Sequence, residues 1–390
     1  MSSAFRPSRA IALFLVILAP VMWSEAQTTD APSAASLQLW QAAMTGSLAD
    51  VQAALAAKAP VDAESGSQMT ALGIAALYGH ASIASALVAA GANVAADQGG
   101  ETALMVAAHE GHVEVANVLM AAGANVAAKD KFGMTALMAA AGANRAGVAR
   151  ALLAKGANPN DASPDGATAL TAAAYGGYPE TARVLVDAGA NVNSKDSSGR
   201  TPLMAAALSG SSDVARLLLD RKADLNAEDA GGSTALIYAA ANGHFEFIDL
   251  LAGAGLTKGA DMGLAFAVRG CHMPTVRRLL DSGAKTTAAI DGTPVIVLAA
   301  AGNCREAIEL LLAKGADVNA ADEEGETALM QAATSGFTAV AQLLLDRGAN
   351  LDQPSKKNQT AWLMAAMGDQ RDVVEIFKAY REKHPSPQPK

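Results

Sequence analysis

The chain has 390 residues and a formal net charge of −9 at pH 7, from 29 basic and 38 acidic side chains. Hydrophobic residues make up 51% of it but aromatic residues only 4%, so the apolar content is mostly alanine and leucine, which are strong helix formers. The acidic balance argues against a nucleic-acid partner, because a negative surface repels the phosphate backbone.

Residues 1–26 have the layout of a secretory signal peptide. Arg6 and Arg9 give a positive start, residues 11–22 form an apolar run, and Ser24-Glu25-Ala26 places small residues where a signal peptidase cleaves. The run is shorter than the roughly 20 residues of a membrane-spanning helix, and no other stretch is apolar enough to cross a bilayer. We therefore expect a periplasmic or secreted protein with no membrane span in its mature chain; an uncleaved N-terminal anchor is the alternative.

A short phrase, Thr-Ala-Leu or a close variant, recurs about every 33 residues along the rest of the chain. It begins at Thr70, Thr102, Thr135, Thr168, Thr201, Thr234, Thr293, Thr327 and Thr360. A fixed period of this size is typical of a solenoid, in which each unit packs only against its neighbours.

The unit that begins at Thr102 predicts two helices and a turn. Thr102 can cap the first helix through its hydroxyl oxygen, and Gly111 and Gly123 are suited to end the two helices. The residues from Asp130 to Gly133 then predict a tight turn before the next threonine. Repeating this unit predicts a stack of helix pairs.

The same signals divide the chain into segments. We expect a flexible lead-in at 27–36, a repeat array at 37–380 with an N-terminal cap at 37–69, internal repeats at 70–359 and a C-terminal cap at 360–380, and a disordered tail at 381–390.

One unit is irregular, because 59 residues separate Thr234 from Thr293 instead of about 33. We place an additional unit at 253–292, with Asp261 in the threonine position and a connection before it that is too short for the usual turn. The array then holds about 11 units.

The phrases T-P-L-M-A-A-A at Thr201 and T-A-L-M-Q-A-A at Thr327 resemble the ankyrin repeat. The resemblance implies an all-α solenoid of helix-turn-helix units with protruding β-turn fingers. This chain departs from the family pattern in two ways: most copies have alanine where the family prefers proline, which Pro202 and Pro294 keep, and methionine often replaces the family's histidine, as at Met105.

No pattern in the sequence predicts catalysis. There is no G-x-S-x-G or P-loop motif, and His109 and His112 straddle Gly111, so they do not share a helix face as a zinc motif requires. We expect no catalytic residues, no metal and no cofactor.

The two cysteines fall at nearly the same place in adjacent repeats. Helix layers about 10 Å apart argue against a bond between Cys271 and Cys304, since disulfides need Cα atoms within ~7 Å. A one-residue difference in register and a loop location favour it, and an oxidising compartment would permit it. The sequence leaves both a disulfide and two separate thiols open.

The resemblance also implies where a partner would bind, on finger tips and the exposed ends of the first helices. The matching finger positions are Gln98, Lys131, Phe132, Met134, Asp165, Arg200, Glu323, Glu324 and Glu326, and the matching helix positions are Tyr78, His109, Glu110, Tyr175, Asn242 and Arg269. Phe132, Tyr78 and Tyr175 are expected anchors, because a few large side chains dominate most interfaces; packing against a neighbouring finger is the alternative for Phe132.

Two charged groups stand out within this surface. Lys258, Arg269, Arg277, Arg278 and Lys285 form a positive group in the irregular repeat, interpreted either as a solvated helix face or as a contact for an acidic partner. The cluster of Asp322, Glu323, Glu324 and Glu326 is either a solvated tip or a docking point for a basic partner.

Taken together, these features predict a monomeric, non-catalytic scaffold that binds a protein partner on the concave face of fingers and helices. The alternative is a redox or small-ligand function centred on Cys271 and Cys304.

Overall fold

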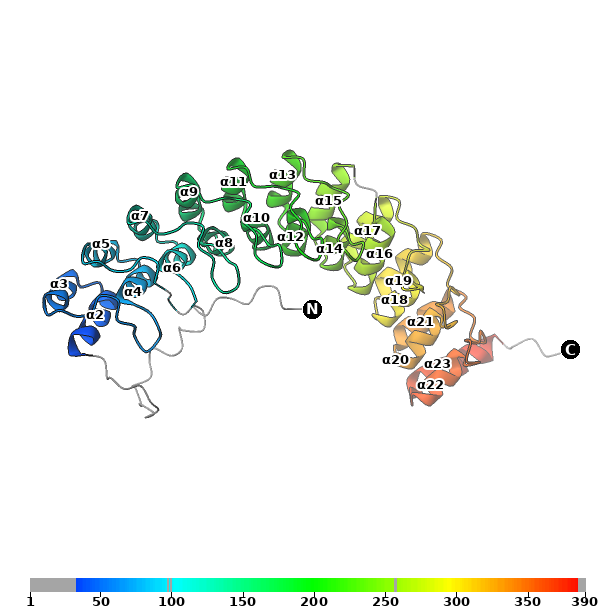
Figure 1. Cartoon of the computed structure of the whole chain (residues 1–390). Coiled ribbons are helices and arrows are strands. Elements are labelled where there is room, and N and C mark those ends of the chain that lie inside the picture. Colours follow the sequence, from blue (N-terminus) through cyan, green and yellow to red (C-terminus); the bar gives the residue numbers. More distant parts are fainter. Residues whose placement is uncertain (1–32, 97, 99, 256–257, 385–390) are drawn as a thin grey trace.

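The structure, a computed structural model, describes residues 33–96, 98, 100–255 and 258–384. Within these residues, 22 helices form 11 antiparallel pairs that stack into a curved array (Figure 1). The first helices of the pairs, here the inner helices, line the concave side of the arc, and the second helices, here the outer helices, line the convex side (Figure 1). The fold is therefore the all-α repeat solenoid that the sequence predicts.

The inner helices are α2 (Ala34–Thr45), α4 (Ala71–Tyr78), α6 (Ala103–Glu110), α8 (Ala136–Gly142), α10 (Ala169–Tyr175), α12 (Pro202–Ser209), α14 (Ala235–Ala241), α16 (Ala260–Arg269), α18 (Val295–Ala301), α20 (Ala328–Ser335) and α22 (Ala361–Met367). The outer helices are α3 (Leu48–Ala56), α5 (Ala81–Ala89), α7 (Val113–Ala121), α9 (Ala146–Ala154), α11 (Pro179–Asp187), α13 (Ser212–Asp220), α15 (Phe245–Gly253), α17 (Met273–Asp281), α19 (Arg305–Ala313), α21 (Thr338–Asp346) and α23 (Arg371–Lys383). The strands β1 (Ala289–Ile290) and β2 (Thr293–Pro294) form one short antiparallel hairpin before α18.

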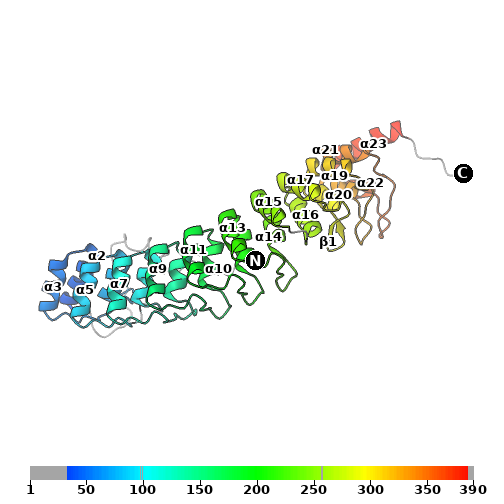
Figure 2. The same cartoon turned by 90° about the horizontal axis from the view of Figure 1, so that it is seen from above.

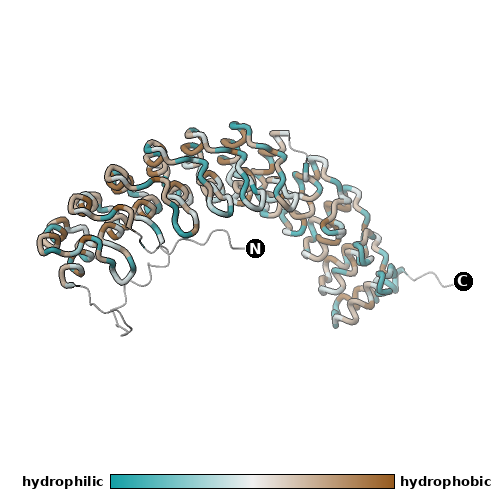
Figure 3. Tube along the Cα trace, in the orientation of Figure 1, coloured by the Kyte–Doolittle hydropathy of each residue, from teal (hydrophilic) through white to brown (hydrophobic). Residues whose placement is uncertain are grey.

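The core runs as one continuous layer between the helices. In α6, Leu104, Ala107 and Ala108 are fully buried, and in α7, Val115 and Leu119 are fully buried. Alanine at the contact between inner helices lets neighbouring pairs approach closely, which is why a chain with few aromatic residues still fills its interior. Hydrophobic colour follows the helices and hydrophilic colour gathers in the connections (Figure 3).

Most inner helices begin at the repeated threonine. The Thr201 hydroxyl accepts a hydrogen bond from the Met204 backbone N–H at 3.4 Å, and six other inner helices have the same cap. Thr234 is the exception among the described threonines at this position, because its buried hydroxyl makes no hydrogen bond.

The connections that lead into the inner helices form fingers along one edge of the array (Figure 2). Between α15 and α16 the connection runs only from residue 254 to 259, so this joint has no finger. Asp261, near the start of α16, accepts a hydrogen bond from the Lys285 backbone N–H. In regular units, a finger side chain such as Asn160 makes the equivalent bond to the next unit, at Asn191.

The expected boundaries need three corrections. Residues 33–36 do not belong to a flexible lead-in, because Ser33 caps α2 by accepting from the Ser36 backbone N–H. Residues 381–383 continue α23 rather than forming a tail. In the irregular region α16 starts at Ala260, and Pro294, not Thr293, is the N-cap of α18, so Asp261 and Thr293 do not occupy the capping position. The signal peptide, the rest of the lead-in and residues 385–390 lie outside the described residues.

Among the described residues, none of the helices combines the length and the apolar character that crossing a bilayer requires.

Candidate partner-binding surface

Four of the described fingers are each shaped by one aspartate side chain. The Asp130 carboxylate accepts hydrogen bonds from the backbone N–H groups of Phe132, at 2.8 Å, and Met134, at 2.7 Å. Asp196, Asp229 and Asp322 repeat this pattern in later fingers. The aspartate therefore fixes the turn, and the two residues that follow it are held at the tip.

Several predicted anchors do lie at the surface. Phe132 is 66% exposed at its fingertip, and Tyr175 is 51% exposed at the end of α10. The Lys131 ammonium lies 5.3 Å from the centre of the Phe132 ring, close enough for a cation–π contact. Phe132 does not pack into the core, so its ring is available to a partner.

The ends of the inner helices add polar groups to this surface. In α6, the His109 imidazole lies 2.9 Å from the Glu110 carboxylate, with both side chains about a quarter exposed. The exposed Asn242 donates to the Tyr238 carbonyl oxygen at 2.8 Å, and Arg200 pairs with Asp196 at 2.8 Å.

The repeated helix pair and its finger decide the family. The family model named Ankyrin repeats (3 copies) matches residues 39–130, 122–196, 188–264, 264–355 and 296–386. The chain belongs to the ankyrin-repeat family. A comparison with curated proteins finds no match.

Gln98 is a correction to the expected ankyrin surface. Its side chain is only 8% exposed, and its amide oxygen accepts a hydrogen bond from the Thr70 backbone N–H at 2.8 Å. A Cβ atom on Gly73 would lie 2.2 Å from that amide oxygen, so the glycine makes room for the glutamine. Gln98 is thus a structural link between repeats. Met134 is also half-buried and packs against the core.

The positive group of the irregular repeat does not form one surface. Arg277 and Arg278 lie on the outer helix α17, whereas Arg269 ends the inner helix α16. Arg278 pairs with Asp249 at 2.6 Å, and Lys258 pairs with Glu228 at 2.9 Å. The three arginines are thus divided between an inner and an outer helix, and a contact for an acidic partner stays a prediction.

The acidic finger is partly structural. Asp322 fixes the turn, and the Glu326 carboxylate accepts from the Gln331 amide at 2.8 Å. Glu323 and Glu324 are exposed at the tip, as is Asp165 on its own finger. Only the exposed part of this cluster is free to face a partner.

One ionisable residue that sequence reasoning missed lies in the N-terminal half of the surface. Burial raises the pKa of Glu101, and the negative charges of Asp130 and Glu110 raise it further, although His109 and Lys131 act in the opposite direction. The Glu101 carboxyl group, which interacts with His109 and Glu110, therefore ionises less readily than that of an ordinary glutamate. The sequence signal that could have identified Glu101 is its position directly before the capping residue Thr102.

A second set of side chains forms hydrogen bonds between consecutive repeats. At the start of the outer helices, His80, His112, His244 and His272 each place the imidazole Nε2 within 3.2 Å of a carbonyl oxygen in the preceding repeat. A carbonyl oxygen can only accept, so Nε2 is the donor. These histidines are structural, and no group of three or more histidine, cysteine or acidic side chains in the described residues could hold a metal ion.

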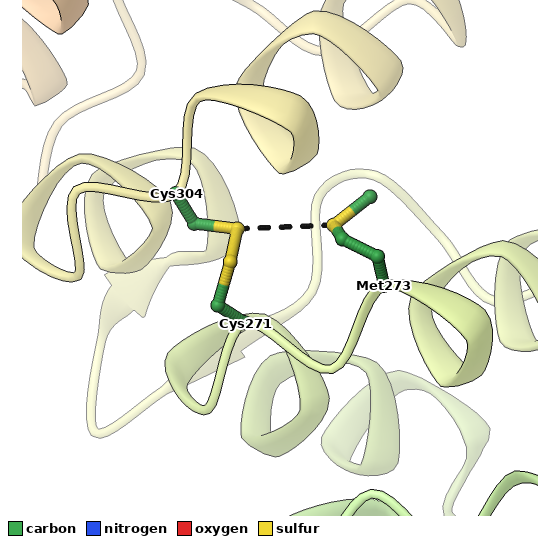
Figure 4. The surroundings of a disulfide bond; sticks show 3 residues. All are labelled: Cys271, Met273 and Cys304. Carbon is green, nitrogen blue, oxygen red and sulfur yellow. Dashed lines mark hydrogen bonds between the residues drawn. A yellow bond between two sulfur atoms is a disulfide. The ribbon is translucent and has the colours of Figure 1, made fainter.

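The cysteines use the same position for a covalent link. Cys304 stands where His272 stands in the preceding unit, at the start of its outer helix, and its sulfur is bonded to that of Cys271 (Figure 4). The Cα atoms are 5.7 Å apart, well below the spacing of helix layers, because Cys271 lies in the loop one residue before His272. The Met273 sulfur lies 3.7 Å from that of Cys304. While this bond is intact, neither sulfur is available as a thiolate nucleophile.

Proposed function

We propose that this ankyrin-repeat chain is a protein-binding scaffold that holds its partner on the concave side, between the fingers and the ends of the inner helices. The observation that carries this proposal is the exposure of Phe132 and Tyr175. Large aromatic side chains contribute much of the binding energy in most interfaces, and these two are exposed where the fingers and inner helices end.

The proposal also covers the oligomeric state and the cellular location of the protein. The scaffold acts without catalysis, as a monomer, in the periplasm or the extracellular medium. The apolar run and the two arginines at the start of the sequence support export. The intact bond between Cys271 and Cys304 does not favour the redox alternative.

Photo-crosslinking in the native compartment tests the surface. A photoreactive amino acid replaces Tyr175 on the concave side or, as a matched control, the exposed Asn117 on outer helix α7. We expect a defined crosslinked protein from position 175 and none of that mass from position 117. Phe132→Ala should lower the yield from position 175. Equal products from both positions would reject the proposed surface.

A further inference from the structure

The concave side contains an apolar groove at its N-terminal end. A space of about 440 Å³ lies between α2, α4 and the connection at residues 57–70, here the first finger. Trp40, Met69 and Ile74 contribute buried apolar surface to its lining, and Leu37, Met44 and Tyr78 are 51%, 38% and 38% exposed along it. This volume is within the range of about 300–1,000 Å³ of pockets that bind ligands.

Small side chains keep this groove open. The finger beside it contains Ser65, Gly66 and Ser67, and a Cβ atom on Gly66 would meet no other atom within 4 Å. Trp40 donates a hydrogen bond from its indole N–H to the Ala63 carbonyl oxygen at 3.0 Å, which fixes this finger against α2. The apolar wall is therefore held in place without being covered.

The N-terminal repeats that contain the groove have a net negative charge. Between residues 33 and 128 there is one basic lysine or arginine, Lys58, against seven acidic residues: Asp50, Asp62, Glu64, Asp97, Glu101, Glu110 and Glu114. The sequence beyond residue 128 is much closer to balance, because 26 of the 27 basic residues that follow the signal segment are found there. A partner at this end meets apolar contacts in a net negative part of the chain, where the exposed Glu64 directly precedes the lining residue Ser65.

We infer that this groove binds a segment of a partner protein that carries bulky apolar side chains next to lysine or arginine. The apolar side chains would replace water against Leu37, Met44 and Tyr78, and the basic groups would be attracted by the net negative charge of the N-terminal repeats. Negative charge disfavours an anionic lipid surface and an acidic segment alike. This inference rests on the proposed function and specifies the partner's chemistry.

Trp40 provides a direct reporter. In a chain with Trp23→Phe and Trp362→Phe, Trp40 is the remaining tryptophan, and Trp362 lies at the other end of the array against Phe377. The probe is an amphipathic peptide of about 14 leucines and lysines, four helical turns. Two control peptides replace leucine with serine or lysine with glutamate. We expect only the leucine–lysine peptide to change the Trp40 emission, and added salt to weaken its binding.

A matched pair of variants locates the contact. Leu37→Gln with Met44→Gln should weaken binding at least about tenfold, because it removes the exposed apolar wall. Leu363→Gln with Met367→Gln makes the same change at the exposed α22 and should leave binding unchanged. Equal binding by the two variants, or equal binding of the serine–lysine peptide, would overturn the inference. A response to phosphatidylglycerol vesicles in place of the peptide would overturn it too.

The two proposals can fail separately. If the crosslink from position 175 survives Leu37→Gln with Met44→Gln at full yield, the groove is not where the native partner binds, and the concave scaffold stands. If position 175 gives no crosslink, the proposed function fails whatever the peptide does.

Discussion

At the scale of single residues, the finger aspartates are the side chains on which the surface depends. Burial would raise the pKa of Asp229, but hydrogen bonds from Tyr238, Ser233 and Gly231 outweigh it and lower that pKa. The Tyr238 hydroxyl donates to the Asp229 carboxylate at 2.5 Å, which ties the finger to its own inner helix. A fingertip residue is presented to a partner only while such contacts hold the turn.

This contact predicts a dependence of stability on alkaline pH. Burial and the Asp229 carboxylate raise the pKa of Tyr238 from 10.0 to about 12. Because the folded-state pKa is the higher one, the protonated phenol stabilises the fold fully below pH 10, and this stabilisation is lost as the pH rises towards 12. Urea unfolding between pH 9 and 11 should show a steeper loss in the natural chain than in Tyr238→Phe. Parallel curves for the two proteins would contradict it.

Gln98 shows how a single residue can mislead a prediction from sequence. Its position in the repeat indicated an exposed tip, yet the residue is buried because Gly73 replaces the bulky residue that Met105 or Met138 provides in other repeats. The signal was present in the sequence, but at a position 25 residues away from Gln98. To predict which residues of a repeat are exposed, the core residues of the neighbouring repeat must therefore be considered as well.

At the scale of helices, the period, the capping threonines and the helix-ending glycines were sufficient to predict the pairs. The register of the irregular unit was not predictable, for two reasons. The shortened connection lets α16 start early, at Ala260, and the β1–β2 hairpin uses Thr293 as a strand residue and leaves Pro294 as the cap. Both depend on contacts between segments and not on the local pattern.

The threonine caps give a matched test of helix stability. Thr201→Val removes a bonded capping oxygen and should cost about 1 kcal/mol of unfolding free energy. Thr234→Val keeps the shape of a buried side chain whose hydroxyl has no hydrogen bond, so it should not destabilise the protein. Urea midpoints of the two variants measure the difference. A Thr234→Val loss as large as that of Thr201→Val would show that Thr234 does cap α14.

At the scale of the whole molecule, stability is approximately a sum over repeats and the joints between them. The missing finger between α15 and α16 removes one set of contacts, and the disulfide strengthens the next joint along the array. The sequence placed both features in adjacent units but could not decide whether the cysteines meet, because this depends on how closely the loops of neighbouring units approach.

Replacing the disulfide tests the strength of this joint. Cys271→Ser with Cys304→Ser should lower the unfolding free energy of the C-terminal repeats by about 3–4 kcal/mol, as expected for a loop of this length. Cys271→Gly with Cys304→His restores the arrangement in which a glycine faces the histidine of the next unit, as Gly46 faces His80 and Gly79 faces His112, and should regain about 1 kcal/mol. Urea unfolding followed by circular dichroism measures both. Identical midpoints for the serine variant and the natural chain would show that the joint does not need the bond.

The even stacking of the inner helices also limits what can lie across them. Neighbouring helix layers are about 10 Å apart, so the array offers its contacts at a nearly constant interval. A peptide in the polyproline II conformation advances about 3.1 Å per residue and has three residues per turn, so it would meet successive layers with every third side chain. A helical ligand advances about 1.5 Å per residue and would do so with every seventh, which is the spacing of a heptad. A bound sequence should therefore carry its recognition residues at one of these two intervals.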